Sequence, residues 1–355
     1  NPETLVLDVA RVFFPALISF VIGIGITPLL SYYLYKHQMW KKKSVALALD
    51  GGPATISNAL HNDEVKKTPR MGGIIIWVST FLTIFFFYIL SKMGQGSLAE
   101  HFDFLSRNQT WLPLATLLAG SLIGLLDDIF VVSNRGSYVG GGIPLSIRIG
   151  LVILLGIISG WWFYEKLGVS AIDIPFYGEF SLGYFFIPFF TLVMLAIFSG
   201  GVIDGIDGLS GGIMATIFAA YGGIAFFQNQ IDLAAFSIVV TGAILAFLWF
   251  NIPPARFFMS ETGMLGLTTS LTVIAFLTKA VAVLPIIAFP LFAASGSVII
   301  QVLSKKLRGG KKVFLVAPIH HHFEALGWPA YKVTMRFWVI SVITALAGMV
   351  LALIG

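Results

Sequence analysis

The sequence predicts an all-α, polytopic membrane protein with about ten transmembrane helices. Of its 355 residues, 57% are hydrophobic and 11% are charged, and the mean hydropathy is +0.91. Soluble domains carry about 25% charged residues, so the composition excludes an ordinary soluble protein. The isoelectric point near 9.3 is explained by membrane topology, and no nucleic-acid partner is expected. Residues 1–355 are predicted to form a single integral membrane domain.

Ten apolar windows are each long enough to cross a bilayer as a helix. The ninth contains Pro285 and Pro290, which are expected to bend or break it, because proline lacks the N–H group that a helix interior needs. After the fourth window, residues 172–182 alternate around a Tyr-Gly turn, which predicts a small hairpin outside the membrane. The windows are residues 12–35, 71–91, 111–130, 144–163, 184–203, 209–227, 233–250, 262–280, 282–303 and 334–354.

The basic residues predict the orientation of these spans. Ten spans place both termini on one side of the membrane and divide the loops into two sets. One set carries 17 Lys and Arg residues, and the other carries only Arg11, Lys92, Arg107, Lys166 and Lys279. Because loops rich in Lys and Arg stay in the cytoplasm, both termini are predicted to lie outside.

Acidic side chains gather on the predicted cytoplasmic side. Asp127 and Asp128 end the third span, Asp204 and Asp207 lie in the short loop after the fifth, and Glu261 begins the eighth. Three consecutive histidines follow the ninth span. Segments far apart in the sequence therefore converge on one face, which predicts a common site. The loops expected to form it are residues 36–70, 127–143, 204–208, 251–262 and 304–333.

The Asp127-Asp128 pair interrupts an apolar run. A charge in a transmembrane helix costs roughly 2.5–3.5 kcal/mol at the bilayer centre and less near the interface, so such residues indicate function. Consecutive side chains point about 100° apart on a helix, so the two need not serve one ligand. The pair is expected to bind a metal, act as a general base or pair with a lysine, and the alternative is a solvated helix end.

Two other segments are expected to contact a ligand. The glycine-rich run Ser199–Leu209 lets the backbone approach a ligand closely, and Asp204 and Asp207 supply hydrogen-bond acceptors. The alternative is a tight turn in which Asp207 caps the next helix. The run Lys66–Gly73 is expected to clamp a diphosphate, or else to be the ordinary basic flank of the second span.

The histidines His320, His321 and His322 are consecutive. They cannot all face one way, so a metal cage formed by the three is not expected. Because Lys311 and Lys312 lie nearby in the sequence, hydrogen bonding to phosphate oxygens is the favoured role.

Together these motifs resemble the phospho-N-acetylmuramoyl-pentapeptide transferase family of the polyprenyl-phosphate N-acetylhexosamine-1-phosphate transferases. The resemblance covers most of the chain. Its most specific element is Pro318–Glu324, which separates this family from transferases of other sugar phosphates. The sequences Leu126-Asp127-Asp128, Asp204–Gly208 and Leu248–Asn251 are similar to motifs of the wider superfamily.

The resemblance implies a ten-helix homodimer in the bacterial inner membrane with a cytoplasmic active site. It implies a Mg²⁺-dependent transfer of phospho-MurNAc-pentapeptide from UDP-MurNAc-pentapeptide to undecaprenyl phosphate, a membrane lipid, giving lipid I and UMP. The implied catalytic residues are Asp127, Asp128, Lys66, His320, His321 and His322. The implied substrate-binding residues are Lys67, Thr68, Asp204, Gly205, Ile206, Asp207, Asn251 and Phe258. The implied magnesium ligands are Glu261 and Asp128.

The chain departs from the family pattern at three places. Glu261 replaces an aspartate that binds magnesium in the family, Arg70 replaces a threonine, and Ser199–Ile203 lacks two asparagines. Magnesium requires near-ideal octahedral geometry, so the longer carboxylate of Glu261 requires a backbone adjustment. These changes leave open a catalytically impaired, divergent member.

Physical chemistry favours direct in-line attack by the lipid phosphate. A phosphate monoester is largely dianionic at pH 7, so it needs charge compensation more than a general base. A covalent intermediate on Asp127 or Asp128 is the alternative mechanism. The alternative functions are a sibling transferase of another UDP-N-acetylhexosamine, a receptor without activity, and a transporter. Acids at one membrane face rather than at the midplane argue against transport.

Overall fold

The computed structural model describes residues 2–41, 67–93, 102–133 and 142–355. Lys66 therefore lies outside the described residues, as do parts of the predicted loops 36–70 and 127–143. Everything that follows concerns the described ranges.

The predicted all-α membrane fold is confirmed. Within the described ranges, nine helices are long and apolar enough to cross a membrane. Apolar segments take this form because a helix satisfies its own backbone hydrogen bonds where no water is present. The nine are α1 (Pro2–Lys36), α3 (Ile74–Met93), α5 (Trp111–Ser133), α6 (Leu145–Lys166), α7 (Phe186–Ser199, which short 3-10 turns extend to Gly183–Ile203), α8 (Leu209–Phe227), α9 (Ile231–Asn251), α10 (Ser260–Leu277) and α14 (Ala330–Ile354).

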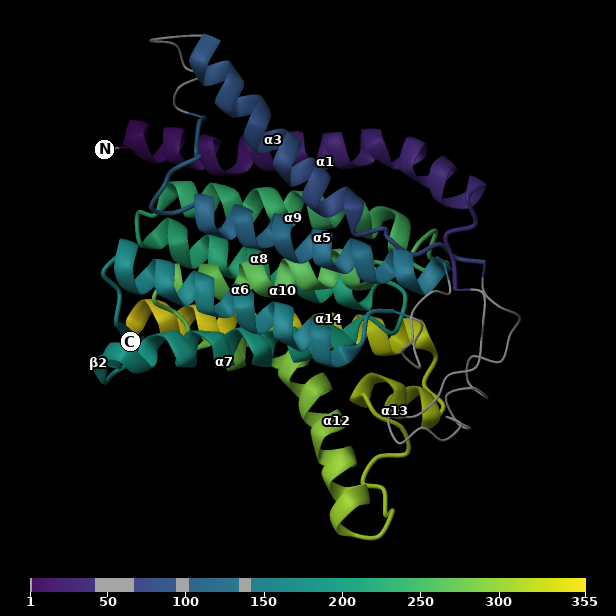
Figure 1. Ribbon diagram of the computed structural model, residues 1–355. Coiled ribbons are helices and arrows are strands. Elements are labelled where there is room, and N and C mark those ends of the chain that lie inside the picture. Colours follow the sequence, from purple (N-terminus) through teal and green to yellow (C-terminus); the bar gives the residue numbers. More distant parts are fainter. Residues whose placement is uncertain (1, 42–66, 94–101, 134–141) are drawn as a thin grey trace.

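The ninth predicted span, residues 282–303, is divided as its prolines predict. It forms the single turn α11 (Leu284–Ile287) and the helix α12 (Phe289–Leu307), with Pro285 and Pro290 in the first turns of the two helices. Figure 1 shows α12 leaving the bundle obliquely, so it is not aligned with the other long helices. The predicted interruption is confirmed, because proline is tolerated at the start of a helix and not in its interior. Within the described ranges, this window is not among the helices long and apolar enough to cross a membrane.

The predicted hairpin is also present. Strands β1 (Ala171–Ile174) and β2 (Gly178–Ser181) pair antiparallel, with Ala171 opposite Ser181. The hairpin and both termini lie at one end of the bundle in Figure 1. The opposite end, where α5 ends and α10 begins, is called the site end below. Three short elements complete the fold: the 3-10 turns η1 (Gly183–Phe185) and η2 (Gly200–Ile203), and the helix α13 (Ile319–Ala325).

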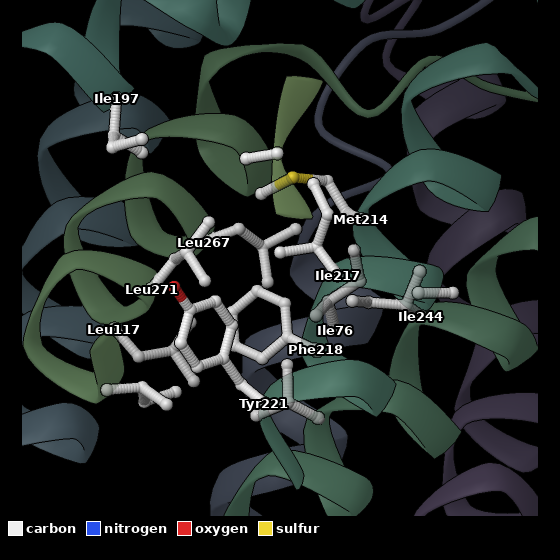
Figure 2. Packing of buried hydrophobic residues seen from close by; sticks show 14 of the residues in the cluster. Ile76, Leu117, Ile197, Met214, Ile217, Phe218, Tyr221, Ile244, Leu267 and Leu271 are labelled. Carbon is white, nitrogen blue, oxygen red and sulfur yellow. The ribbon is translucent and has the colours of Figure 1, made fainter. Parts of the chain in front are cut away.

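Helices α8, α9 and α10 form the interior of the bundle. Helix α10 packs against α5, α9 packs against α1 and α8, and α14 covers α8. Figure 2 shows the centre of the core, where Phe218 and Tyr221 of α8 meet Leu267 and Leu271 of α10. The Tyr221 hydroxyl donates to the carbonyl of Ala280 at 3.1 Å, so even this buried polar group is satisfied. This packed core holds the starts and ends of the helices at fixed positions at the site end.

Candidate functional site at one end of the helix bundle

Asp128 is held from both sides. Its side chain is fully buried. Oδ1 accepts a hydrogen bond from Arg70 Nε at 2.8 Å. Oδ2 accepts from the backbone N–H of Thr262 at 3.0 Å and from its hydroxyl at 2.6 Å. The carboxylate is thus fixed between the segment before α3 and the start of α10, and both of its oxygens already have partners.

Asp127 points toward a different set of partners. Its Oδ1 accepts a hydrogen bond from the backbone N–H of Ile143 at 2.7 Å, and its Oδ2 lies 3.8 Å from Nη1 of Arg148. The same Nη1 lies 2.6 Å from Oε1 of Glu261. Arg148, from the first turn of α6, therefore bridges the carboxylates of α5 and α10. Because the two aspartates diverge, they do not form a single two-carboxylate ligand.

The close approach of α5 and α10 depends on a glycine. Gly124 lies one turn before Asp128, and a Cβ atom there would lie 2.1 Å from the backbone oxygen of Glu261. Small residues let helices pack closely where lipid offers no hydrophobic driving force. This contact brings the start of α10 within hydrogen-bonding distance of Asp128.

Arg70 is placed by a backbone pairing between two loops. The N–H of Phe258 donates to the carbonyl of Pro69 at 2.9 Å, and the N–H of Gly72 donates to the carbonyl of Phe258 at 2.8 Å. The segment before α3 therefore runs beside the segment before α10. Phe258 is half-buried here, and of the residues just before Pro69, Lys67 is exposed and Thr68 is half-buried.

Asp204 lies in the turn between η2 and α8. Its Oδ1 accepts a hydrogen bond from the hydroxyl of Ser210 at 2.6 Å, and its Oδ2 accepts from the backbone N–H of Ser260 at 2.8 Å. Burial raises the pKa of Asp204 above its ordinary value, and the hydrogen bonds from Ser210 and Ser260 oppose that shift. The turn is thereby tied to the start of α10, beside Glu261.

Asp207 and Asn251 hold the same turn from the other side. Asp207 Oδ2 accepts from the backbone N–H of Ala255 at 3.1 Å, so Asp207 does not cap α8 as the alternative interpretation had it. Asn251 Oδ1 accepts from the N–H of Gly208 at 2.9 Å, and Nδ2 donates to the carbonyl of Phe257 at 2.9 Å. These contacts shape the loop backbone around Asp204, Gly205 and Ile206.

Helix α13 brings two of the three histidines to Gly205. A Cβ atom on Gly205 would lie 2.7 Å from Nε2 of His320 and 2.6 Å from Nε2 of His321, so only glycine fits there. His321 Nδ1 lies 2.6 Å from Oε2 of Glu324, which orients its ring. His322 points elsewhere, and its Nδ1 accepts from the backbone N–H of Leu315 at 3.2 Å. Two histidines and the Asp204 turn therefore share one surface.

His320 predicts a pH dependence of stability. It is fully buried, and neither ring nitrogen has a hydrogen-bond partner among the residues that the structure describes. Burial, and then the neighbouring His321, lowers its pKa well below the ordinary value. Below about pH 6.5 only the unfolded chain binds this proton, so the free energy of unfolding should fall by up to about 1.4 kcal/mol per pH unit. Thermal unfolding in detergent between pH 5 and 7 measures this slope.

The substitution His320→Asn should reduce the slope, because the side chain that takes up the proton is gone. His37→Asn is the control, since His37 is exposed at the end of α1. An equal slope in His320→Asn and the parent protein would show that His320 is not the group responsible.

The expected magnesium ligands do not fit a metal ion as the structure arranges them. Glu261 Oε1 is engaged by Arg148, and both oxygens of Asp128 are engaged by Arg70 and Thr262. Across the described ranges, no group of three or more His, Asp or Glu side chains is arranged to hold a metal ion. The guanidinium groups of Arg70 and Arg148 would also repel a metal cation at this position.

Sequence reasoning missed the partners that hold the acids. Arg70 belongs to the expected diphosphate clamp and is a departure from the family pattern, but the sequence did not identify it as the partner of Asp128, and Arg148 counted only as one basic residue of the predicted cytoplasmic loops. Thr262, Ser210 and Ser260 were not singled out at all. A usable signal was present for the arginines, because buried carboxylates must pair with cations, and these two lie in loops on the same predicted face.

The comparisons with known proteins identify the family of the chain. Residues 110–279 match the model of glycosyl transferase family 4. The chain is 32% identical over 339 residues to the phospho-N-acetylmuramoyl-pentapeptide-transferase of Caldanaerobacter subterraneus subsp. tengcongensis, covering 94% of this chain and 96% of that protein. It is 35% identical over 289 residues to the enzyme of the same name from Listeria innocua, covering 80% and 84%. The chain therefore belongs to the phospho-N-acetylmuramoyl-pentapeptide transferase family and is a phosphoglycosyl transferase.

Proposed function

We propose that this enzyme transfers phospho-MurNAc-pentapeptide from UDP-MurNAc-pentapeptide to undecaprenyl phosphate, releasing UMP and forming lipid I. The observation that carries the proposal is the convergence of Asp128, the Asp204 turn and the two histidines at the site end. These residues come from helices and loops up to about 200 residues apart in the sequence. The chain is similar to relatives named phospho-N-acetylmuramoyl-pentapeptide-transferase. In the membrane, the site end faces the cytoplasm and both termini face outside.

The reaction needs two anions to meet. An oxygen of the lipid phosphate forms a bond to the β-phosphorus of the donor, and the bond from that phosphorus to the bridging oxygen breaks. The electron pair leaves with UMP, so no external reactant is needed. Because the lipid phosphate is largely dianionic at pH 7, the protein contributes mainly position and positive charge.

The residues divide into two groups by location. The turn Asp204–Asp207, with His320 and His321, is the proposed nucleoside-binding surface, beside Asn251 and Phe258. Asp127 and Asp128 are the proposed reaction centre. Lys66 remains part of the proposal, although it lies outside the described residues, and Lys67 and Thr68 lead from it toward Arg70. Their proposed role is to attract the diphosphate.

The resemblance also implies a homodimer and a magnesium ion that Glu261 and Asp128 would bind. Magnesium would supply charge compensation for the diphosphate. Because Glu261 and Asp128 are engaged by arginines and Thr262, no step of the proposed transfer is assigned to the ion. The homodimer is carried over as part of the proposal.

The test is release of UMP by purified, full-length protein in detergent. We expect release from UDP-MurNAc-pentapeptide only when undecaprenyl phosphate is present. Assays in magnesium and in EDTA determine the metal requirement separately. Radiolabelled UDP-N-acetylglucosamine serves as the competing donor, and faster transfer from it would assign the enzyme to a sibling specificity. No release with either donor would contradict the proposal.

The mechanism is tested by isotope exchange. Labelled UMP is incubated with donor and enzyme in the absence of lipid. Direct attack predicts no exchange of label into the donor, because no intermediate forms without the acceptor. Exchange at the rate of turnover would instead support a covalent intermediate on Asp127 or Asp128.

A further inference from the structure

Arg70 differs from Arg148 in how much of its guanidinium is used. Arg70 donates to Asp128 through Nε alone, at 2.8 Å, and its side chain is 26% exposed. Within the described ranges, neither of its η nitrogens forms a hydrogen bond or an ion pair. A guanidinium carries five N–H donors in a rigid fork, so most of the donors of Arg70 remain available for a second anion.

The guanidinium of Arg148 is already paired with carboxylates of the protein. Its Nη1 lies 2.6 Å from Glu261 and 3.8 Å from Asp127, its Nε is buried, and the side chain is only 13% exposed. It therefore acts as a positioning residue that holds Glu261. Arg148 therefore occupies Oε1 of Glu261, which leaves only one oxygen of this carboxylate for a metal ion that requires strict octahedral geometry.

The surroundings of Arg70 keep it cationic. Burial alone would lower its pKa, but the charge and hydrogen bond of Asp128, followed by the charges of Glu261 and Asp204, raise the pKa above its ordinary value. Arg70 thus lies within electrostatic reach of both Asp128 and the proposed nucleoside turn. The guanidinium would attract the anionic phosphates of a nucleotide bound at that turn.

We propose that Arg70 binds the diphosphate of the nucleotide donor directly, as the fixed cation of this site, in place of a divalent ion held by Asp128 and Glu261. Arg–phosphate pairs are charge-assisted and frequently bidentate, so Arg70 matches a diphosphate without the strict ligand geometry that magnesium demands. The proposal rests on the proposed function, because the diphosphate is that of its donor. It concerns this chain, where arginine replaces the threonine of the family pattern.

The first experiment measures UDP binding by isothermal titration calorimetry, with full-length protein in EDTA. The parent protein should bind UDP without metal. Arg70→Gln should weaken UDP binding by about 10-fold to 100-fold, the loss expected for one or two charge-assisted hydrogen bonds. Binding of uridine, which has no phosphate, should not change. Arg107→Gln is the control for loss of one positive charge, since Arg107 is exposed and lies just before the start of α5, whereas α5 ends at the site end.

A second variant separates binding from folding. Arg70→Gln leaves Asp128 buried without its cation, which destabilises the protein. The double variant Arg70→Gln/Asp128→Asn removes both charges together and should unfold near the temperature of the parent. It should still bind UDP as weakly as Arg70→Gln does. Parent-like UDP affinity in the folded double variant would overturn the proposal.

The metal is tested with Mn²⁺ alone, by electron paramagnetic resonance in the absence of nucleotide. The parent protein should bind little Mn²⁺. The variant Arg70→Thr/Glu261→Asp restores the residues of the family pattern and should bind Mn²⁺ more tightly. Equal Mn²⁺ binding by the two proteins would overturn the proposal, and so would UDP binding by the parent that requires a divalent ion.

The two proposals can fail separately. An enzyme that forms lipid I, but whose Arg70→Gln variant binds UDP within about twofold of the parent, retains its function and refutes the role of Arg70. An enzyme with Arg70-dependent UDP binding that transfers nothing to undecaprenyl phosphate supports Arg70 and refutes the transfer. If Arg70→Gln weakens binding of farnesyl phosphate and not of UDP, the assignment to the donor is wrong.

Discussion

Asp128→Asn should lower the rate of transfer by about 100-fold to 1000-fold, the range found when one preorganised polar group is removed from an active site. An asparagine has the size of the aspartate but only one acceptor oxygen and no charge. It cannot accept from both Arg70 and Thr262, as Asp128 does at Oδ1 and Oδ2. The guanidinium would lose its fixed position, and the charge at the reaction centre would change by one unit.

The protein should nevertheless fold. Arg70 is partly exposed and can turn away from the amide, so the expected cost is about 1–3 kcal/mol in the free energy of unfolding. UMP release and thermal unfolding are measured on the same preparation. Asp173→Asn in the hairpin is the matched control, because the Asp173 side chain is 40% exposed and its Oδ2 lies 3.6 Å from Nζ of Lys279, at the other end of the bundle. Transfer by folded Asp128→Asn within about twofold of the parent would remove Asp128 from the reaction centre.

The fold was predictable in most of its parts because the bilayer restricts what an apolar segment can do. A run of about 20 apolar residues must form a helix, and Pro285 and Pro290 indicate where one such run is interrupted. The direction in which α12 leaves the bundle (Figure 1) was not predictable. That direction depends on contacts with η2, α13 and α14, which come from distant parts of the sequence.

The candidate site was predictable as a location but not as a set of contacts. Counting spans is enough to bring Asp128, Asp204 and Glu261 to one end of the bundle. The ion pairs require more, because they depend on the rotation of each helix about its axis. Arg148 reaches Glu261 across 113 residues of sequence, and a different rotation of α6 would have turned it toward solvent or lipid.

Gly124→Ala should affect both stability and activity, because Gly124 sets the distance between α5 and α10. The new Cβ atom would lie 2.1 Å from the oxygen and 2.4 Å from the carbonyl carbon of Glu261, and 2.7 Å from the backbone nitrogen of Thr262. All three are backbone atoms, so the helices must separate. Overpacking of this kind costs about 1–3 kcal/mol, and a misplacement of about 1 Å at a reaction centre can lower the rate about 100-fold.

Gly150→Ala in α6 provides the matched control. Gly150 is exposed, and a Cβ atom there meets nothing within 4 Å. The same substitution at Gly150 should therefore stabilise the helix by up to about 1 kcal/mol through helix propensity alone. In Gly124→Ala, the unfolding temperature and the rate of UMP release should both fall. In Gly150→Ala, neither should fall. If Gly124→Ala unfolds at a lower temperature yet keeps its transfer rate, the hydrogen bonds from Thr262 to Asp128 do not matter for catalysis. If both properties are unchanged, α5 and α10 do not pack as closely as the structure has them.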